Sequence, residues 1–282
     1  MKNLTSYSYQ KNSATKDSPY VEWLLIGIAI CFMTIMLIVP LLVVFYEAFK
    51  EGLLVYIASL ADPDALYAIK LTLTTALIIL PINTVIGVAM AYLITRHEFW
   101  GKTLITTLLD LPFAISPVVA GLMFVLLFGA NTVLGKFFAT TFDIQIIFAT
   151  TGIVLATLFV TFPLIARELI PLMQSQGSGE EEAALTLGAN GWQMFWHITL
   201  PNIKWALLYG MILTNARAMG EFGAVSVVSG HIRGETNTMP LMIEIAYNDY
   251  AFTAAFALSS LLALLALLTL ILQTLMNKTK NL

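Results

Sequence analysis

Two residues of opposite charge, Arg217 and Glu221, lie inside an otherwise apolar stretch of the sequence. Because they are four residues apart, a helix would place them on one face, together with Thr214. A charge at mid-membrane costs about 2.5–3.5 kcal/mol on insertion scales, so such residues pair with each other or line a wet pathway. Both interpretations are open. Arg217 either clamps helices together or lends positive potential to a cavity crossed by a dianion, with Glu221 holding it in place.

Further polar residues accompany prolines in another apolar stretch. Asp110 lies just before Pro112, and Ser116 just before Pro117. Proline removes a backbone donor and tends to kink a helix, which membrane bundles tolerate where neighbours satisfy the freed carbonyl. The prolines either shape the helix only or bend it beside a pathway, which Asp110 and Ser116 would then line.

The residue types that carry enzymatic chemistry are not grouped in this sequence. Its three histidines, His97, His197 and His231, are too scattered to suggest a metal site. The segment 101–103 (Gly-Lys-Thr) imitates the end of a phosphate-binding loop, but Arg96 stands where such a loop needs a glycine. We therefore expect no catalytic or metal-binding residues, and no cofactor bound by this chain.

Composition assigns the chain to the membrane. Of its 282 residues, 59% are hydrophobic and 11% charged, the mean hydropathy is +0.84 and the net charge is −3. Soluble domains carry about 25% charged residues, so a cytosolic enzyme, a nucleic-acid binder and a disordered chain are excluded. The single cysteine, Cys31, cannot form an internal disulfide.

Six stretches are long enough to cross a membrane as helices of about 20 residues. They are 22–48, 66–95, 103–128, 144–170, 203–228 and 250–276. The short alternating strands of a membrane barrel are not present in the sequence. We therefore predict an all-α integral membrane protein, with a polar tail at 1–20 and one six-helix domain at 21–282.

The distribution of Lys and Arg predicts the orientation. With the N-terminus inside, the inner side carries Lys2, Lys11, Lys16, Arg96, Lys102, Arg167, Lys204, Lys278 and Lys280. The outer side carries Lys50, Lys70, Lys136 and Arg233. This excess agrees with the positive-inside rule. Both termini and a long loop at about 171–202 are then cytoplasmic.

The long loop is predicted to form two short helices around a glycine turn. Ser178 and Glu181 have capping-box spacing, Gly188 would end the first helix, and Asn190 would cap the second. The second helix carries Trp192, Phe195 and Trp196. Exposed aromatic residues are costly unless something covers them, so this helix either lies on lipid or docks on another protein.

The loop resembles the EAA loop of bacterial ABC-importer permeases. The matching residues are Glu182, Ala183, Ala184, Gly188, Ile198, Leu200 and Pro201. The resemblance implies a type I ABC-importer permease fold and a loop that docks, with Trp192 included, into a cytoplasmic ATPase subunit. The chain departs from many members at Trp196 and His197, where those often carry basic residues. That departure puts a charge contribution from this part of the loop in doubt.

The segments 110–121, 213–230 and 232–237 are more specifically similar to CysW-type subunits of the sulfate/thiosulfate permease family. The similarity runs from the first span to about Leu275. It implies import of sulfate and thiosulfate across a bacterial inner membrane by alternating access. The implied partners are two copies of an ATPase that uses ATP–Mg, a second homologous permease forming a heterodimer, and an extracytoplasmic sulfate/thiosulfate-binding protein.

Other functions stay open at this point. Molybdate, tungstate and phosphate are also tetrahedral oxyanions, and a pathway alone would hardly separate them from sulfate. An intramembrane enzyme using Arg217, Glu221 and Asp110 would leave the loop unexplained, and a structural scaffold would not need Arg217. The outer segment 229–249, with a short helix near Met239–Ala246, either meets the binding protein or is an ordinary solvated loop.

Overall fold

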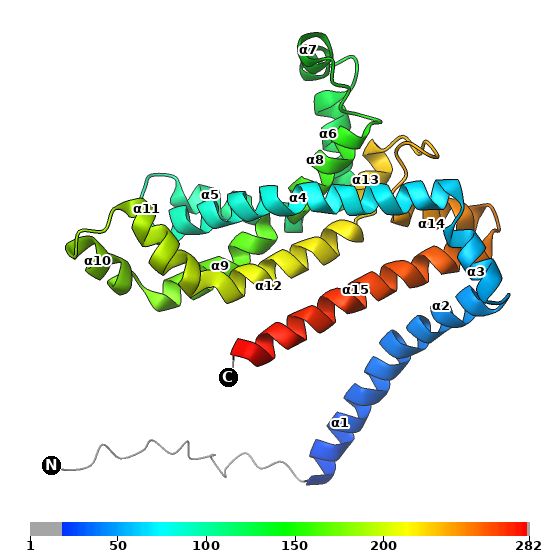
Figure 1. The fold of residues 1–282 in the computed structure, drawn as a ribbon, viewed down its shortest axis with the longest axis horizontal. Coiled ribbons are helices and arrows are strands. Elements are labelled where there is room, and N and C mark those ends of the chain that lie inside the picture. The colour runs from blue at the N-terminus through cyan, green and yellow to red at the C-terminus, as the bar shows by residue number, and fades with distance from the viewer. Residues whose placement is uncertain (1–18, 281–282) are drawn as a thin grey trace. The chain divides into compact units, whose positions relative to one another are not determined.

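The computed structural model describes residues 19–280, and every regular element in this range is helical (Figure 1). The helices are α1 (Pro19–Met33), η2 (Thr34–Ile38), α2 (Val39–Phe49), α3 (Leu53–Leu60), α4 (Pro63–Arg96), α5 (Lys102–Ala114), α6 (Pro117–Phe128), α7 (Val133–Phe142), α8 (Thr150–Thr161), α9 (Pro163–Gln176), α10 (Gly179–Thr186), α11 (Gly191–Met194), η3 (Phe195–Thr199), α12 (Leu200–Met219), α13 (Gly223–Val228), α14 (Met239–Asn248) and α15 (Phe252–Lys280). The prediction of an all-α protein is confirmed. The predicted tail at 1–20 lies almost wholly outside the described residues.

The chain forms two units, Met1–Tyr46 and Glu47–Leu282. In the first unit, α1, η2 and the start of α2 make one apolar helical stretch. Large apolar side chains are exposed along it, including Trp23 (73%) and Phe32 (60%). Such a surface is stable in lipid, so this stretch agrees with the expected first span.

Four helical stretches are long and apolar enough to cross a membrane: Tyr20–Phe49, Pro63–Arg96, Thr150–Gln176 and Phe252–Leu272. A bent pair, α5 with α6, raises the number to as many as five among the described residues. The predicted total of six spans therefore stays a prediction. The fourth span begins later than expected, at 150 rather than 144, because Asp143 and Phe148 have positive φ angles that no helix allows.

The third and fifth expected spans are interrupted. Between Ala114 and Pro117 the chain turns by 109°, because Ile115 is extended and Pro117 starts a new helix. Of the two prolines expected to bend this span, Pro117 lies at the bend, whereas α5 continues through Pro112. The expected continuous helix at 203–228 is wrong, since α12 ends at Met219 and α13 begins only at Gly223.

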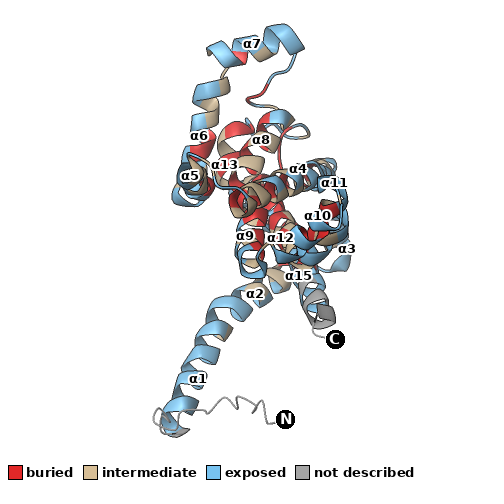
Figure 2. Ribbon diagram, turned by 90° about the vertical axis from the view of Figure 1, so that its left-hand side faces the viewer, coloured by how far each residue is buried: buried red, intermediate tan, exposed pale blue. Residues whose placement is uncertain are grey.

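The second unit is packed around its smallest residues. A Cβ at Gly87 of α4 would lie 2.7 Å from Cβ of Ile165 in α9, and one at Gly210 of α12 would lie 3.1 Å from the Ile165 Cα. Small residues of this kind let membrane helices approach closely. Figure 2 shows the buried residues gathered where α4, α8, α9, α12 and α13 meet, while α7 is largely exposed.

The two helix breaks pack against each other. A Cβ at Gly121 of α6 would lie 2.7 Å from the carbonyl oxygen of Ala224 in α13. A Cβ at Gly223 would lie 2.9 Å from Cβ of Pro117. The α5–α6 corner and the α12–α13 corner are therefore neighbours inside the second unit.

Replacing Gly121 by alanine tests this packing. We expect Gly121→Ala to lower the free energy of unfolding by about 1–3 kcal/mol, the usual cost of overpacking, because backbone must move to admit the methyl group. The matched control is Gly27→Ala, at a helical position where a Cβ meets no atom within 4 Å. Thermal unfolding in detergent should show a lower Tm for the first variant alone, and equal Tm values would contradict the close approach.

Candidate functional site

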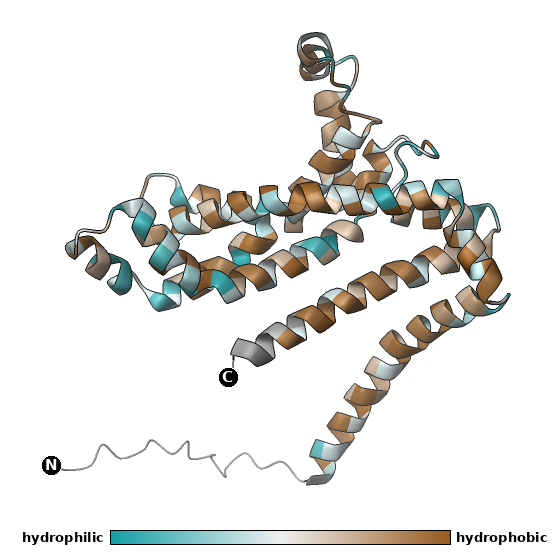
Figure 3. Cartoon of the chain, viewed as in Figure 1, coloured by the Kyte–Doolittle hydropathy of each residue, from teal (hydrophilic) through white to brown (hydrophobic). Residues whose placement is uncertain are grey.

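The long loop folds as two short helices joined by a glycine turn, as the sequence predicts. Asn190 caps α11, and its side chain and that of Gln193 form a reciprocal capping box. Gly188 has φ +90°, and the amides of Gly188 and Ala189 donate to the carbonyls of Leu185 and Ala184. This is the Schellman pattern that ends a helix at glycine. Figure 3 shows hydrophilic residues gathered at this end of the unit.

The expected capping box at Ser178 is wrong. The Ser178 hydroxyl makes no cap hydrogen bond and donates instead to the Glu182 carboxylate. Glu181 is turned inward, with its Oε2 2.6 Å from Nε of Arg96 and its Oε1 accepting from the Thr199 hydroxyl at 2.7 Å. Arg96 and Thr199 occupy both carboxylate oxygens, so Glu181 does not bond to the backbone at the start of its helix.

The EAA residues are divided between an outer and an inner face. Glu182 and Ala183 are exposed, whereas Ala184 is buried. Ile198 and Leu200 are half-buried where η3 passes into α12, and Pro201 is exposed there. Glu182 and Ala183 therefore lie on the exposed face of α10, and Ala184 lies on its buried face.

A hydrophobic surface lies beside these residues. Leu187 is 89% exposed at the tip of the loop, and Trp192 is 71% exposed. The rings of Trp192 and Trp196 are 5.6 Å apart in an edge-to-face arrangement, which fixes their orientation. The surface is apolar and exposed, so it suits a protein partner or lipid.

Arg217 and Glu221 form an ion pair, with Nη2 and Oε2 3.0 Å apart. They do not share a helical face as expected, because Glu221 lies in the break after α12. Its other oxygen accepts the Ala224 amide at 3.0 Å at the start of α13. The Glu221 side chain is 1% exposed and that of Arg217 45%. The carboxylate is therefore buried, and the guanidinium reaches the surface.

The other expected pathway residues are placed differently. Thr214 is fully buried, so it shares no exposed surface with Arg217. Asp110 is exposed and pairs with Arg167 of α9, with Nε and Oδ1 3.6 Å apart. The Arg167 guanidinium also lies 4.7 Å from the centre of the Phe113 ring, within cation–π range. Ser116 is exposed at the α5–α6 corner, where its side chain makes no cap hydrogen bond.

The sequence did not predict the ion pairs of Arg96 and Arg167. Neither was expected to pair with another side chain, yet each is an ion-pair partner of a carboxylate on another helix. Arg96 and Glu181 are 85 residues apart, so no local pattern joins them. The only sequence signal for the Arg96 pair was an arginine at the end of an apolar run.

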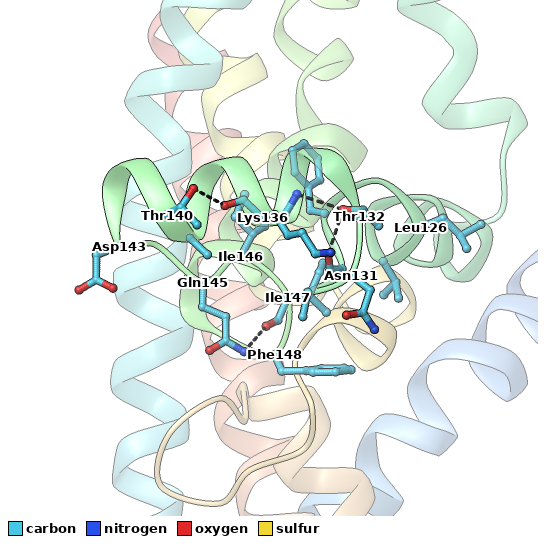
Figure 4. Close-up of a pocket in the computed structure, with 16 residues that line it drawn as sticks. Leu126, Asn131, Thr132, Lys136, Thr140, Asp143, Gln145, Ile146, Ile147 and Phe148 are labelled. Atoms are coloured by element: carbon cyan, nitrogen blue, oxygen red, sulfur yellow. Dashed lines mark hydrogen bonds between the residues drawn. The ribbon is translucent and has the colours of Figure 1, made fainter.

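A cavity of about 770 Å³ lies elsewhere in the unit, between α6, α7 and the loop before α8 (Figure 4). Polar groups at its wall are engaged locally: the Gln145 amide donates to the Ile147 carbonyl and the Thr140 hydroxyl to the Lys136 carbonyl. Its lining does not include Arg217, Glu221 or Asp110. It is therefore separate from the charge pairs described above.

A model of the family described as "Binding-protein-dependent transport system inner membrane component" matches residues 83–281, well over half of the chain. The chain belongs to this family. Its members are transport components of the inner membrane and not enzymes, so the prediction of a non-catalytic membrane subunit and the resemblance to importer permeases are confirmed.

The chain is similar along most of its length to curated permeases. It is 53% identical over 255 residues to the sulfate transport system permease protein CysW of Escherichia coli K12, covering 90% of this chain and 87% of that protein. It is 51% identical to CysW of Synechocystis, covering 92% and 93%. With CysT of Escherichia coli K12 it shares 35% identity, covering 84% and 85%.

A solved structure shares the fold. A chain of a bacterial alginate ABC transporter, crystallised in complex with an alginate pentasaccharide-bound periplasmic protein, matches with a TM-score of 0.75. The sequences are 17% identical, and the match covers 92% of this chain and 93% of the other. The type I permease fold expected from the loop is therefore confirmed as an architecture.

Replacing Gly188 by alanine tests the turn of the loop. A Cβ there would meet no atom within 4 Å, so Gly188→Ala adds only the strain of a positive φ, about 1 kcal/mol. We expect faster hydrogen exchange of the amides of residues 184–194. The control, Gly191→Ala, also has open space but no positive φ. Hydrogen-exchange mass spectrometry should show the change in Gly188→Ala alone, and equal exchange in the two variants would refute it.

Proposed function

We propose that this chain is the permease subunit of an ATP-driven importer. The importer carries sulfate into the cytoplasm and accepts thiosulfate as a second substrate. One observation carries the proposal. More than half of the aligned residues are identical to those of sulfate permeases, over about nine-tenths of the chain. The family assignment and the shared permease architecture support it.

In this proposal the loop at 171–202 faces the cytoplasm and receives an ATPase subunit. Glu182 and Ala183 are exposed on α10 and would enter a groove of the partner, with Leu187 and Trp192 beside them. The ATPases bind and hydrolyse ATP–Mg, and this chain holds no nucleotide. Closure of the ATPases favours one conformation of the permease over the other, which gives alternating access by population shift.

The partner permease is proposed to be a distinct, CysT-like chain. The sequence is markedly closer to CysW proteins than to CysT, although it is related to both. One copy of each would form the membrane channel above two ATPase copies. A sulfate-binding protein on the outer side would deliver the anion to the segment 229–249, which includes α14 as the sequence predicted.

Arg217 is proposed to face the translocation pathway. Its guanidinium is part-exposed, and Glu221 is buried behind it with both oxygens engaged. A passing dianion would therefore meet donors rather than a carboxylate. Asp110 and Ser116 stay assigned to the same pathway, and Arg167, which pairs with Asp110, would screen that carboxylate from the anion.

Reversing the charge of Glu182 tests docking. We expect Glu182→Lys to lower co-purification of the ATPase subunit and sulfate uptake by at least about tenfold, because losing a hydrogen bond to a charged group costs about 1.5–3 kcal/mol. The control is Glu98→Lys, another exposed glutamate, on the other loop expected to be cytoplasmic. Normal co-purification together with normal uptake in Glu182→Lys would rule out the docking role.

Neutralising Arg217 tests the pathway. We expect Arg217→Gln to lower radiolabelled sulfate uptake by about tenfold through loss of charged donors, while ATPase subunits still co-purify. Lys136→Gln, which removes an exposed charge on α7, should leave uptake unchanged. Uptake assays with molybdate and thiosulfate as competitors would also identify the transported oxyanion. Wild-type uptake by Arg217→Gln would sink the pathway role.

A further inference from the structure

The inner end of α4 is fastened to the docking loop by buried charges. Arg96, the last residue of α4, places Nε 2.6 Å from Oε2 of Glu181 in α10 and donates from Nη1 to the Met173 carbonyl of α9 at 3.2 Å. The side chains of Arg96 and Glu181 are only 11% and 9% exposed. Separating them would leave an uncompensated buried charge, so this contact resists slipping.

The start of α12 is held by the same group of residues. The Thr199 hydroxyl donates to Oε1 of Glu181 at 2.7 Å, and the Asn202 amide donates to Oε2 of Glu180 at 2.5 Å. Of the three consecutive glutamates, Glu180 and Glu181 therefore tether α10 to the membrane helices. The third glutamate, Glu182, is exposed. A force on α10 reaches α4 and α12 directly.

The outer end of α4 is fastened to the segment that precedes and begins α14. The Tyr67 hydroxyl donates to the Glu235 carbonyl at 2.9 Å. The Met239 amide donates to the Thr72 hydroxyl at 2.8 Å, and Thr72 in turn donates to the Ala68 carbonyl of α4. Thr72 and Met239 are both buried. Residues 235–239 must therefore follow any displacement of this end of α4.

Between the contacts at its two ends, α4 is one continuous helix. Its 34 residues span about 50 Å at 1.5 Å per residue, and the helix continues through Pro81. The spans α5–α6 and α12–α13 are interrupted by contrast. Figure 1 shows α4 running from the side of α14 to the side of α10 and α11. One continuous helix therefore joins the outer segment to the docking loop.

We propose that α4 is the element that couples arrival of the loaded binding protein outside to ATP hydrolysis inside, with Arg96 as its inner positioning residue. The proposal rests on the proposed function, since it needs both partners. Coupling between two sites needs a physical connection that transmits a displacement from one to the other. The contacts of Arg96 at one end and of Tyr67 and Thr72 at the other attach α4 to both sites.

The test compares one variant at each end of α4. Arg96→Gln removes the inner ion pair, and Tyr67→Phe removes one hydroxyl at the outer end. The matched controls are Lys102→Gln, which removes the Lys102–Glu98 pair, and Tyr46→Phe, at an exposed tyrosine of α2, outside the segment proposed to receive the binding protein. The complete complex, with both permeases and the ATPases, is reconstituted in nanodiscs. ATPase rates are measured with and without sulfate-loaded binding protein.

We expect both α4 variants to lower the stimulation ratio by about fivefold or more, the usual size of a coupling between sites. The controls should keep the wild-type ratio, and Tyr67→Phe should keep the basal rate and the wild-type complement of subunits. A merely structural role would lower yield or basal rate without changing the ratio.

Wild-type stimulation in Tyr67→Phe and in a second outer variant, Thr72→Val, would overturn the proposal, whatever Arg96→Gln does. If Arg96→Gln fails to assemble, Glu181→Gln replaces it, because it keeps the acceptor for Thr199 and loses the charge. A wild-type complex that shows no stimulation by sulfate-loaded binding protein would instead contradict the proposed function, so the two failures are distinguishable.

Discussion

Hydrocarbon cannot solvate a charge, and the arrangement of this chain depends on that constraint. Three ion pairs that join different segments of this apolar chain differ in their exposure. Arg96–Glu181 is nearly buried, Arg217–Glu221 has one buried and one exposed partner, and Asp110–Arg167 is half-exposed on both sides. Separating Arg96–Glu181 or Arg217–Glu221 would leave an uncompensated buried carboxylate, whereas the half-exposed Asp110–Arg167 pair contributes little. The two pairs with a buried carboxylate therefore fix the relation between the segments that they join.

The same constraint explains how the helix breaks are tolerated. A helix that stops inside a membrane exposes amides and carbonyls that lipid cannot satisfy. At the α12–α13 break the Glu221 carboxylate accepts the Ala224 amide, so a charged side chain replaces the missing backbone acceptor. The neighbouring break at Ile115 and Ser116 is covered by the close packing of Pro117 on Gly223. The two corners support each other, and a shift of one requires a shift of the other.

Local patterns in the sequence predict the local features of this structure. The apolar runs predict α4 and α15, Pro117 predicts the corner before α6, and Asn190 and Gly188 predict the two helix ends of the loop. What the sequence did not predict depends on distant partners. Glu181 was assigned to its own helix end because Arg96 is 85 residues away. The break after Met219 was missed because glycine and apolar residues continue across it, and the buried carboxylate that stabilises it has no local signature.

The unequal exposure of Arg217 and Glu221 bears on how an importer could handle a dianion. A fully exposed ion pair would present both charges and repel as much as it attracts. Here both carboxylate oxygens are engaged, one by Arg217 and one by Ala224, in a side chain that is 1% exposed. The guanidinium has more donors than this single contact uses, and the Arg217 side chain is 45% exposed. The pair is neutral overall, which keeps its cost in the membrane low, yet its accessible side is cationic. If Arg217 faces the translocation pathway as proposed, a pair that is neutral overall would hold a passing anion only weakly, which would allow its release.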